Sequence, residues 1–198
     1  MEALVYLLNF VFDAYLMILV LRVWLQAVRA DFYNPFSQFV VKATNPVVIP
    51  FRKIIPGFAG IDMATLLVAF IVIIFKLGSF SLTIDPYTII HPIRNVIGYI
   101  GNPIDLLNLL LSSILFLIKQ SGYLLFIIML VMALMSWVVQ SRSPAQMVFH
   151  QLTEPFLRPI RRIMPDLGGI DLSVLVAFLA LNVINIFIGS LIPIWHYL

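Results

Sequence analysis

The stretch Pro35–Asp62 reads PFSQFVVKATNPVVIPFRKIIPGFAGID, and Pro144–Asp171 reads PAQMVFHQLTEPFLRPIRRIMPDLGGID. Each residue of the second stretch lies 109 positions after its partner in the first, with no gap. Both copies contain a cluster of basic residues, follow one long apolar run and lead into another. We therefore expect a chain built from two tandem repeats, and we call each copy of this stretch an elbow.

The composition is typical of a membrane protein. Of the 198 residues, 62% are hydrophobic and 11% are charged, and the mean hydropathy is +1.07. The charged share is about half that of a soluble domain. The polar side chains are too few to cover the surface of a soluble globule of this size. We therefore expect an all-α protein embedded in lipid.

Four apolar runs are long enough to cross a bilayer as helices. They are Ala3–Leu25, Met63–Phe80, Gly122–Val139 and Leu172–Leu191. A linker, Ser81–Pro103, follows the second run. The next apolar run, Ile104–Ile118, is shorter than a usual span, and its Asp105, Asn108 and Ser112 share one helical face. We expect a short amphipathic helix on the membrane surface there.

Each repeat is predicted to consist of a transmembrane helix, an elbow and a second transmembrane helix. The first repeat covers residues 1–80, the linker with its amphipathic helix 81–118, and the second repeat 119–198. Asn34-Pro35 and Ser143-Pro144 are pairs expected at an N-cap and the first helical position. Short interfacial helices should therefore run over Pro35–Ala43 and Pro144–Leu152. Four prolines should prevent these helices from continuing. They are Pro46, Pro50, Pro155 and Pro159.

Two carboxylates, Asp62 and Asp171, stand directly before apolar runs. We interpret each as the N-cap of the following helix, where it accepts backbone amide hydrogens and complements the helix dipole. The spacing also allows each to pair with the preceding arginine of its own repeat. Near the end of the first span, Arg22 is expected to extend its side chain toward the lipid headgroups.

Positive charge predicts the orientation of the chain, because cytoplasmic loops carry an excess of Lys and Arg. Basic residues gather after the first and third spans. They are Arg29, Lys42, Arg52 and Lys53, then Arg142, Arg158, Arg161 and Arg162. Both elbows should therefore be cytoplasmic, which requires an even number of crossings between them. The repeats are then parallel, and both termini lie on the outer side.

Asp13 and Lys76 lie at similar depths on neighbouring antiparallel spans, about 18 and 21 Å of helix from the elbow side. An ion pair is predicted, because an isolated charge at that depth is costly. It is either a proton or cation relay or a packing contact that fixes which spans pair. When the first span is aligned with the third at Trp24 and Trp137, which end them, the equivalent of Asp13 is Phe126. The equivalent of Lys76, at the offset of the elbows, is Asn185. Asn182 and Asn185 are expected to hydrogen-bond between helices rather than bind an ion.

The remaining patterns exclude several kinds of site. Arginines interleaved with Pro and Ile offer no stacking platform for bases, so the net charge of +3 does not indicate a nucleic-acid partner. The chain has no cysteine, which excludes disulfides and zinc–thiolate sites. His150 and Glu154 share a helical spacing but lack a third metal ligand. With no catalytic or cofactor motif, we expect a non-enzymatic protein without a cofactor.

The elbow pattern Thr-x-Pro-x3-Pro-x-Arg-Arg/Lys-x2-Pro-x3-Gly-Ile-Asp resembles the repeat of the YggT family of bacterial membrane proteins, as do Asp31–Lys42 and Arg158–Arg162. The resemblance covers both copies and nearly the whole chain. It implies a multi-pass inner-membrane protein, with relatives associated with osmotic and ion homeostasis. Other relatives are linked to division, nucleoid organisation or cofactor assembly on membrane complexes. The copies differ at Asn45 and Glu154, so identical roles are not expected.

Two functional hypotheses follow. In the first, a channel-like homo-oligomer supports ion flux under osmotic stress, with a polar path formed by Asp13, Lys76, Asn182 and Asn185. In the second, the protein is a scaffold that recruits an anionic lipid or a cytoplasmic partner through its basic elbow residues. These residues are Arg52, Lys53, Arg158, Arg161 and Arg162. The same residues could instead serve only to orient the chain.

Overall fold

The computed structural model describes residues 2–58, 60–83, 106–138, 143–163, 172–196 and 198. Within these ranges the chain forms helices and no strands. They are α1 (Glu2–Ala27), α2 (Pro35–Arg52), α3 (Met63–Thr83), α5 (Leu106–Val138), α6 (Pro144–Arg161), α7 (Ser173–Leu191) and the short 3₁₀ helix η1 (Pro193–His196). The prediction of an all-helical protein is confirmed for the described part of the chain.

Three helical segments are long and apolar enough to cross a membrane. They are Tyr6–Ala27 in α1, Leu109–Met135 in α5 and Ser173–Leu191 in α7. In α3, Met63–Leu77 forms a shorter apolar helix. The membrane character predicted from composition is therefore supported by three helices, whereas a fourth span in α3 stays a prediction.

The elbow helices α2 and α6 begin where the sequence predicts. The Asn34 Oδ1 atom accepts a hydrogen bond from the Phe36 backbone amide at 2.9 Å, and the Ser143 hydroxyl accepts one from Gln146 at 3.2 Å. Proline occupies the first turn of both helices. Both N-cap predictions are confirmed.

The predicted ends of these helices, at Ala43 and Leu152, are wrong, because α2 continues to Arg52 and α6 to Arg161. The four prolines lie on the exposed faces of the helices, so the carbonyl that each leaves unpaired can bond to solvent. The opposite faces are buried, with Val40, Thr44 and Val48 in α2 and Val148, Leu152 and Leu157 in α6. Packing of these faces holds the turns that contain proline in helical geometry.

The helix α5 runs without a break from Leu106 to Val138. The predicted separation of a short surface helix over Ile104–Ile118 from a span beginning at Gly122 is therefore wrong. Two of its polar side chains face the interior: Ser112 and Ser113 are buried, and Ser113 donates to the Leu109 carbonyl at 2.7 Å. Asp105, on which the predicted polar stripe also rested, lies outside the described residues.

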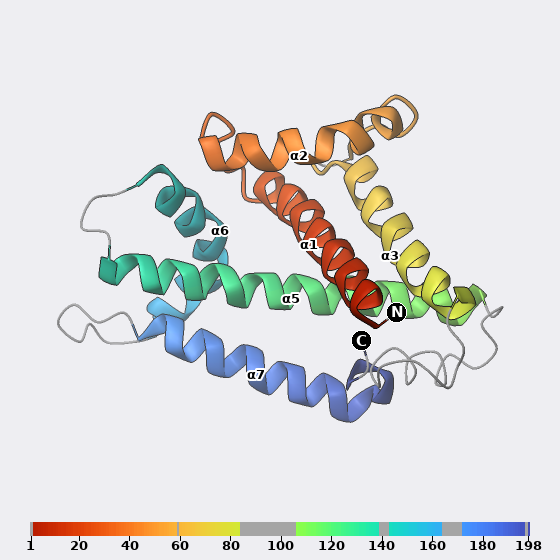
Figure 1. Cartoon of the computed structure of the whole chain (residues 1–198). Helices are drawn as coiled ribbons and strands as arrows, with labels where there is room; N and C mark the ends of the chain where they lie inside the picture. Colours follow the sequence, from red (N-terminus) through yellow and green to blue (C-terminus); the bar gives the residue numbers. More distant parts are fainter. Residues whose placement is uncertain (1, 59, 84–105, 139–142, 164–171, 197) are drawn as a thin grey trace.

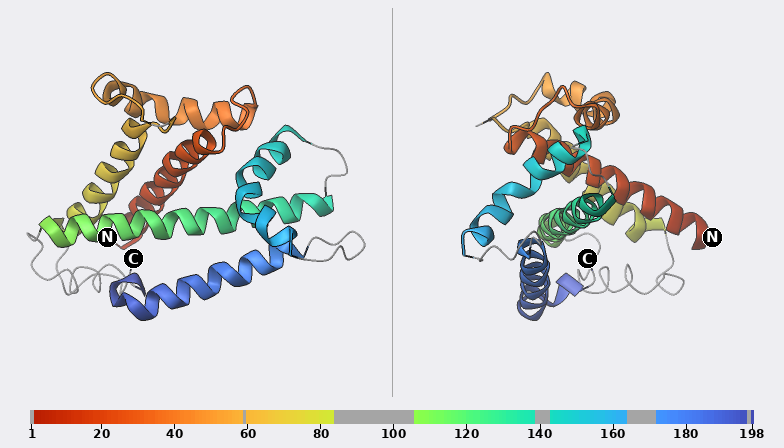
Figure 2. Two further views of the ribbon diagram at one scale, coloured as in Figure 1. Left: turned by 180° about the vertical axis from the view of Figure 1, so that it is seen from behind. Right: turned by 90° about the vertical axis from the view of Figure 1, so that its left-hand side faces the viewer.

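The helices form two hairpins that meet at their elbows. In Figure 1, α2 lies across the ends of α1 and α3, and α6 lies at the end of α5 from which α7 returns antiparallel. Figure 2 shows the same arrangement from behind and from the side. The two elbow helices touch, because the Asn34 side chain donates to the Pro144 carbonyl at 2.6 Å and the Phe36 and Phe149 rings pack edge to face.

The core joins the two repeats. One buried cluster includes Leu21 and Leu25 of α1, Leu124 of α5 and Leu152 of α6, so it draws on both repeats. A second cluster joins α1, α2 and α3 to Phe116 of α5, and a third lies between α5, α6 and α7. The exposed face of α7 is rich in large apolar residues, which suits contact with lipid. Among them are Leu175, Leu179, Val183, Phe187 and Leu191.

Candidate functional site

The predicted ion pair between Asp13 and Lys76 is confirmed. The Lys76 ammonium lies 2.5 Å from the Asp13 carboxylate, and the lysine side chain is buried, which leaves it no route outward to the headgroups. Its nitrogen also lies 4.7 Å from the centre of the Phe116 ring of α5, a cation–π contact. The pair therefore joins α1 to α3 and borders α5.

Polar side chains in the middle of α5 extend this cluster. The Gln120 amide reaches the Asp13 carbonyl at 3.5 Å, and the adjacent Lys119 donates to the Trp195 carbonyl at 2.8 Å. The Trp195 indole in turn donates to the Asn185 side chain of α7 at 2.8 Å. The structure thus brings Asp13, Lys76 and Asn185 toward one stretch of α5, although Asn185 bonds to η1 rather than to a neighbouring span.

Asn182 does not join this cluster. Its amide donates to the Phe178 carbonyl of its own helix at 3.2 Å, and the side chain is exposed on the apolar outer face of α7. The interhelical hydrogen bond predicted for Asn182 is therefore not observed within the described residues.

Arg22 is buried at the end of α1 and does not extend toward the headgroups, so that expectation is wrong. Its side chain is 1% exposed, and its Nη1 atom donates to the Thr44 hydroxyl at 2.5 Å and to the Asn45 side chain at 2.9 Å. Its Nε atom lies 3.8 Å from the Asp62 carboxylate. Elbow helix α2 thus supplies the acceptors that lipid headgroups were expected to supply.

Asp62 connects α1, α2 and α3 at the first elbow. Its carboxylate accepts from the Arg52 Nε atom and the Thr65 hydroxyl, each at 2.7 Å, and from the Arg52 Nη2 atom. Its backbone amide donates to the Gln26 side chain of α1 at 3.0 Å. The predicted pairing with the preceding arginine and the position before α3 are therefore confirmed. Asp171, the partner in the second elbow, lies outside the described residues.

The ionisation of Asp62 follows from these contacts. Burial raises the pKa of the Asp62 carboxyl, but the hydrogen bonds from Arg52 and Thr65 together outweigh burial. The pKa therefore lies below its ordinary value, and the group is ionised at neutral pH. The first elbow holds a buried carboxylate between Arg22 and Arg52.

The described part of the second elbow has side-chain contacts of its own. Arg161 donates to Glu154 at 2.8 Å, and the Thr153 hydroxyl lies 3.3 Å from the Met132 sulfur. Thr44 accepts a hydrogen bond from Arg22, whereas the equivalent Thr153 donates to the Met132 sulfur. Asn45, which accepts from Arg22 in the first elbow, corresponds in sequence to Glu154, which accepts from Arg161 in the second.

Three predicted basic residues remain exposed. Lys53, Arg158 and Arg162 lie on the surface, and none has a partner carboxylate among the described residues. Beside them, Ile54 is 80% exposed and Ile163 is 86% exposed. Each elbow helix therefore ends in an exposed pair of a basic residue and an isoleucine.

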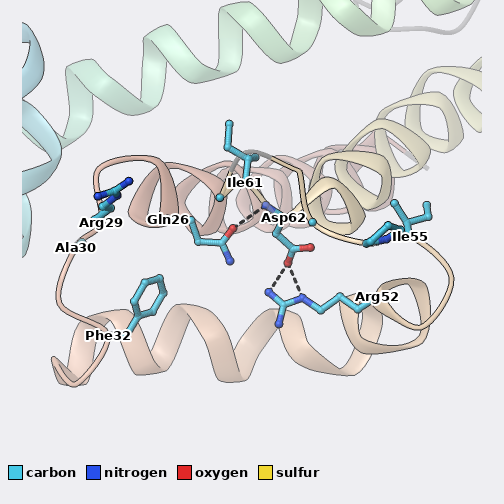
Figure 3. Close-up of a pocket in the computed structure, with 11 residues that line it drawn as sticks. Gln26, Arg29, Ala30, Phe32, Arg52, Ile55, Ile61 and Asp62 are labelled. Atoms are coloured by element: carbon cyan, nitrogen blue, oxygen red, sulfur yellow. Dashed lines mark hydrogen bonds and ion pairs between the residues drawn. The ribbon is translucent and has the colours of Figure 1, made fainter.

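An open pocket of about 600 Å³ lies in the first elbow, between the C-terminal end of α1 and α2. Its polar lining consists of Gln26, Arg29, Arg52 and Asp62, which Figure 3 shows around one space. Sequence reasoning missed Gln26 as a member of this site. The four-residue spacing from Arg22, which places both side chains on one face of α1, is the signal that could have found it.

Comparison with known proteins identifies relatives over almost the whole chain. The family model described as CCB3/YggT matches residues 1–83 and 111–192, and each matched range contains one elbow. An uncharacterised protein of Vibrio alginolyticus is 48% identical over the full length of both chains. The uncharacterised protein YggT of Escherichia coli K12 is 42% identical, covering 97% of this chain and 92% of its own. No solved structure matches the chain.

Proposed function

The chain belongs to the CCB3/YggT family, and from that premise we propose that it is a non-enzymatic scaffold of the bacterial inner membrane. Its elbows face the cytoplasm and bind an anionic lipid or a cytoplasmic protein. Both termini lie in the periplasm, and the two repeats cross the membrane in the same orientation, with α3 as the fourth span. The Lys and Arg excess of the elbows and the contact between α2 and α6 support this orientation.

The observation that carries the scaffold proposal is the duplicated exposed pair at the end of each elbow helix. Lys53-Ile54 and Arg162-Ile163 occupy equivalent positions of the two repeats, and all four side chains are exposed. Arg52 and Arg161, by contrast, are engaged with Asp62 and Glu154. A cation near an anionic membrane surface gains about 1 kcal/mol, and an adjacent exposed isoleucine gains from insertion or docking.

The test compares two variants. Lys53→Ala with Arg162→Ala removes the exposed cation of both pairs, and Lys42→Ala removes an exposed cation elsewhere on α2 as a control. Each protein carries a photoreactive residue in place of Ile163 and is crosslinked in native membranes. We expect one defined lipid or protein adduct, retained in the control and lost in the double variant. Equal adduct yields in the double variant, or no defined adduct from the chain that carries only the photoreactive residue, would contradict the proposal.

A second candidate function, support of ion flux by a channel-like oligomer, is favoured by the polar cluster at the middle of α5. This cluster links the Asp13–Lys76 pair to Gln120 and, through the adjacent Lys119, to Trp195. If it forms an ion path, purified protein in liposomes conducts ions, Asp13→Asn abolishes the flux, and Asn182→Ala on the outer face of α7 does not. Absence of flux from the unaltered protein rules this candidate out.

A further inference from the structure

We propose that the pocket of the first elbow binds a phosphate group, supplied by a phospholipid headgroup at the cytoplasmic surface. The inference rests on the proposed function, because it assumes that the elbow lies at the cytoplasmic lipid–water boundary. The phosphate site lies in a pocket that none of the exposed elbow-pair residues lines.

Two side chains of the pocket, Arg52 and Gln26, are each held in place by a hydrogen bond to Asp62. Each also has a further N–H group that these hydrogen bonds do not use. Asp62 accepts from the Nε and Nη2 atoms of Arg52, and the third guanidinium nitrogen has no partner among the described residues. The Gln26 carbonyl oxygen is fixed by the Asp62 backbone amide. Figure 3 shows the remaining Gln26 amide nitrogen pointing into the space between α1 and α2. Fixed donors of this kind suit an oxyanion.

The charges around the pocket favour an anion. Arg29 and Arg52 line it, and Arg22 is buried behind Asp62 with its Nε atom 3.8 Å from the carboxylate. Asp62 is the one acidic residue that lines the pocket within the described chain, and it is paired with Arg52 and Arg22, so the Arg29 charge is left as a surplus at the lining. Asp31 does not line the pocket and accepts instead from the Tyr33 backbone amide at 2.9 Å. A surplus of arginine favours phosphate over a neutral ligand.

The backbone of Arg29 gives a second, independent observation. Arg29 has a φ of 53°, in the left-handed region, at the position where a helix C-terminus usually carries glycine. The Ala30 amide bonds to the Leu25 carbonyl at 2.9 Å, as the corresponding helix-ending motif requires. An arginine there strains the backbone and places a long cationic side chain at the pocket. A ligand that uses this side chain accounts for the strained position.

The location of the pocket points to a phospholipid as the source of the phosphate. The apolar span of α1 ends at Ala27, and the apolar run of α3 begins at Met63, so the pocket lies where the two spans end. Its remaining wall includes Phe32, Ile55 and Ile61, which suit the glycerol and first methylene groups of a lipid. A free phosphate ion has the same chemistry but gains nothing from this apolar wall.

The test uses Arg29→Gly in the purified full-length chain. Glycine relieves the left-handed strain while removing the cation, so the variant remains folded and unfolds at the same temperature as the original or higher. Native mass spectrometry in detergent measures retention of added phosphatidylglycerol. We expect about a tenfold loss of affinity, the size of one charge-assisted hydrogen bond, whereas Lys42→Gln outside the pocket retains the lipid.

Gln26→Leu provides a second variant that keeps every charge, and we expect it to weaken binding as well. Inorganic phosphate and glycerol 3-phosphate are added as competitors. Displacement of the lipid only at a large excess identifies the lipid as the ligand, and displacement at matched concentration identifies a free phosphate. Equal lipid retention in Arg29→Gly, Gln26→Leu and the original chain overturns the phosphate site. Loss of adducts in the elbow-pair variant is a separate result, because Lys53 and Arg162 do not line the pocket.

Discussion

Arg22 shows how a charge near a span end can be satisfied inside the protein. Its guanidinium is fully buried, and α2 offers the Thr44 hydroxyl, the Asn45 amide oxygen and the Val41 carbonyl as acceptors, while Asp62 balances the charge. Met132 meets the equivalent threonine without any charge. The first elbow is therefore held to its span by hydrogen bonds from a buried charge, and Thr153 of the second by a weaker, uncharged hydrogen bond to sulfur.

Replacing Arg22 should destabilise the first hairpin strongly. Arg22→Met removes the charged donor to Thr44 and Asn45 and one of the two cations beside Asp62, which keeps its hydrogen bonds from Arg52 and Thr65. Because two hydrogen bonds from a charged group are lost, we expect a loss of about 3–5 kcal/mol in the free energy of unfolding. Met132→Leu is the matched control in the second repeat and should cost less than about 1.5 kcal/mol. Unfolding in mixed micelles measures both. A loss for Arg22→Met no greater than that of the control would show that the buried network contributes little.

The contribution of the Asp13–Lys76 pair to stability should depend on the presence of both residues. In a double-mutant cycle with Asp13→Asn and Lys76→Met, we expect a coupling of about 1–3 kcal/mol, because each single change leaves the other charge uncompensated. Exchanging the two residues should restore part of the lost stability. The cycle of Asp13→Asn with Asn182→Ala, which share no partner, should show almost no coupling. A double exchange less stable than either single variant would refute the pairing.

Sequence reasoning predicted these residues unequally. Asp13 and Lys76 could be paired because depth along a span is a one-dimensional quantity, given by about 1.5 Å of rise per residue. The partners of Arg22 and Lys119 depend on which face of a neighbouring segment is turned inward. Residue spacing along the chain does not predict that face. Asn185 was correctly expected to form a hydrogen bond, but its partner Trp195 lies in a segment with no regular pattern.

At the scale of helices, starts were easier to predict than ends. An N-cap depends only on neighbouring residues, because the side chains of Asn34 and Ser143 accept hydrogen bonds from the first turn of the helix that follows. The end of α2 depends on whether burial of Val48 outweighs the hydrogen bond lost at Pro50, which is a question of tertiary packing. The same reasoning applies to α5. The polar residues between Ile118 and Gly122 suggested a break in the helix, but Lys119 bonds to η1 and Gln120 to α1, so the helix continues.

The docking of η1 on α7 can be tested at one glycine. A Cβ atom at Gly189 would overlap the His196 ring, so Gly189→Ala should displace His196 and loosen Trp195 from Asn185 and Lys119. We expect a red shift of Trp195 fluorescence in a chain whose other two tryptophans are replaced by phenylalanine.

Two companion variants make this result specific. Gly122→Ala has open space for its methyl group and should leave the spectrum unchanged while stabilising α5 by about 0.5–1 kcal/mol. His196→Ala added to Gly189→Ala should remove the overlap and restore the original emission. An unshifted spectrum in Gly189→Ala alone would show that the ring moves aside without loosening η1.

At the scale of the whole molecule, the duplication accounts for the two hairpins but not for their differences. Each repeat places a proline-containing helix across the turn between two apolar helices, and the two elbow helices touch through Phe36 and Phe149. The described contacts of the elbows nevertheless differ, since buried Arg22 donates to Thr44 whereas Met132 lies against the equivalent Thr153. The repeat could be read from the sequence, but the contacts of Arg22 with Thr44 and of Arg161 with Glu154 required the side-chain geometry.

The central claim is that both elbows face the cytoplasm and both termini face the opposite side. The chain contains no cysteine, so single cysteines in place of Ala3, Lys53, Arg162 and Leu198 can each be introduced without removing others. A membrane-impermeant maleimide is applied to spheroplasts and to inside-out vesicles. We predict labelling at positions 3 and 198 only in spheroplasts, and at positions 53 and 162 only in inside-out vesicles. Labelling of positions 53 and 162 from opposite sides of the membrane would contradict the account.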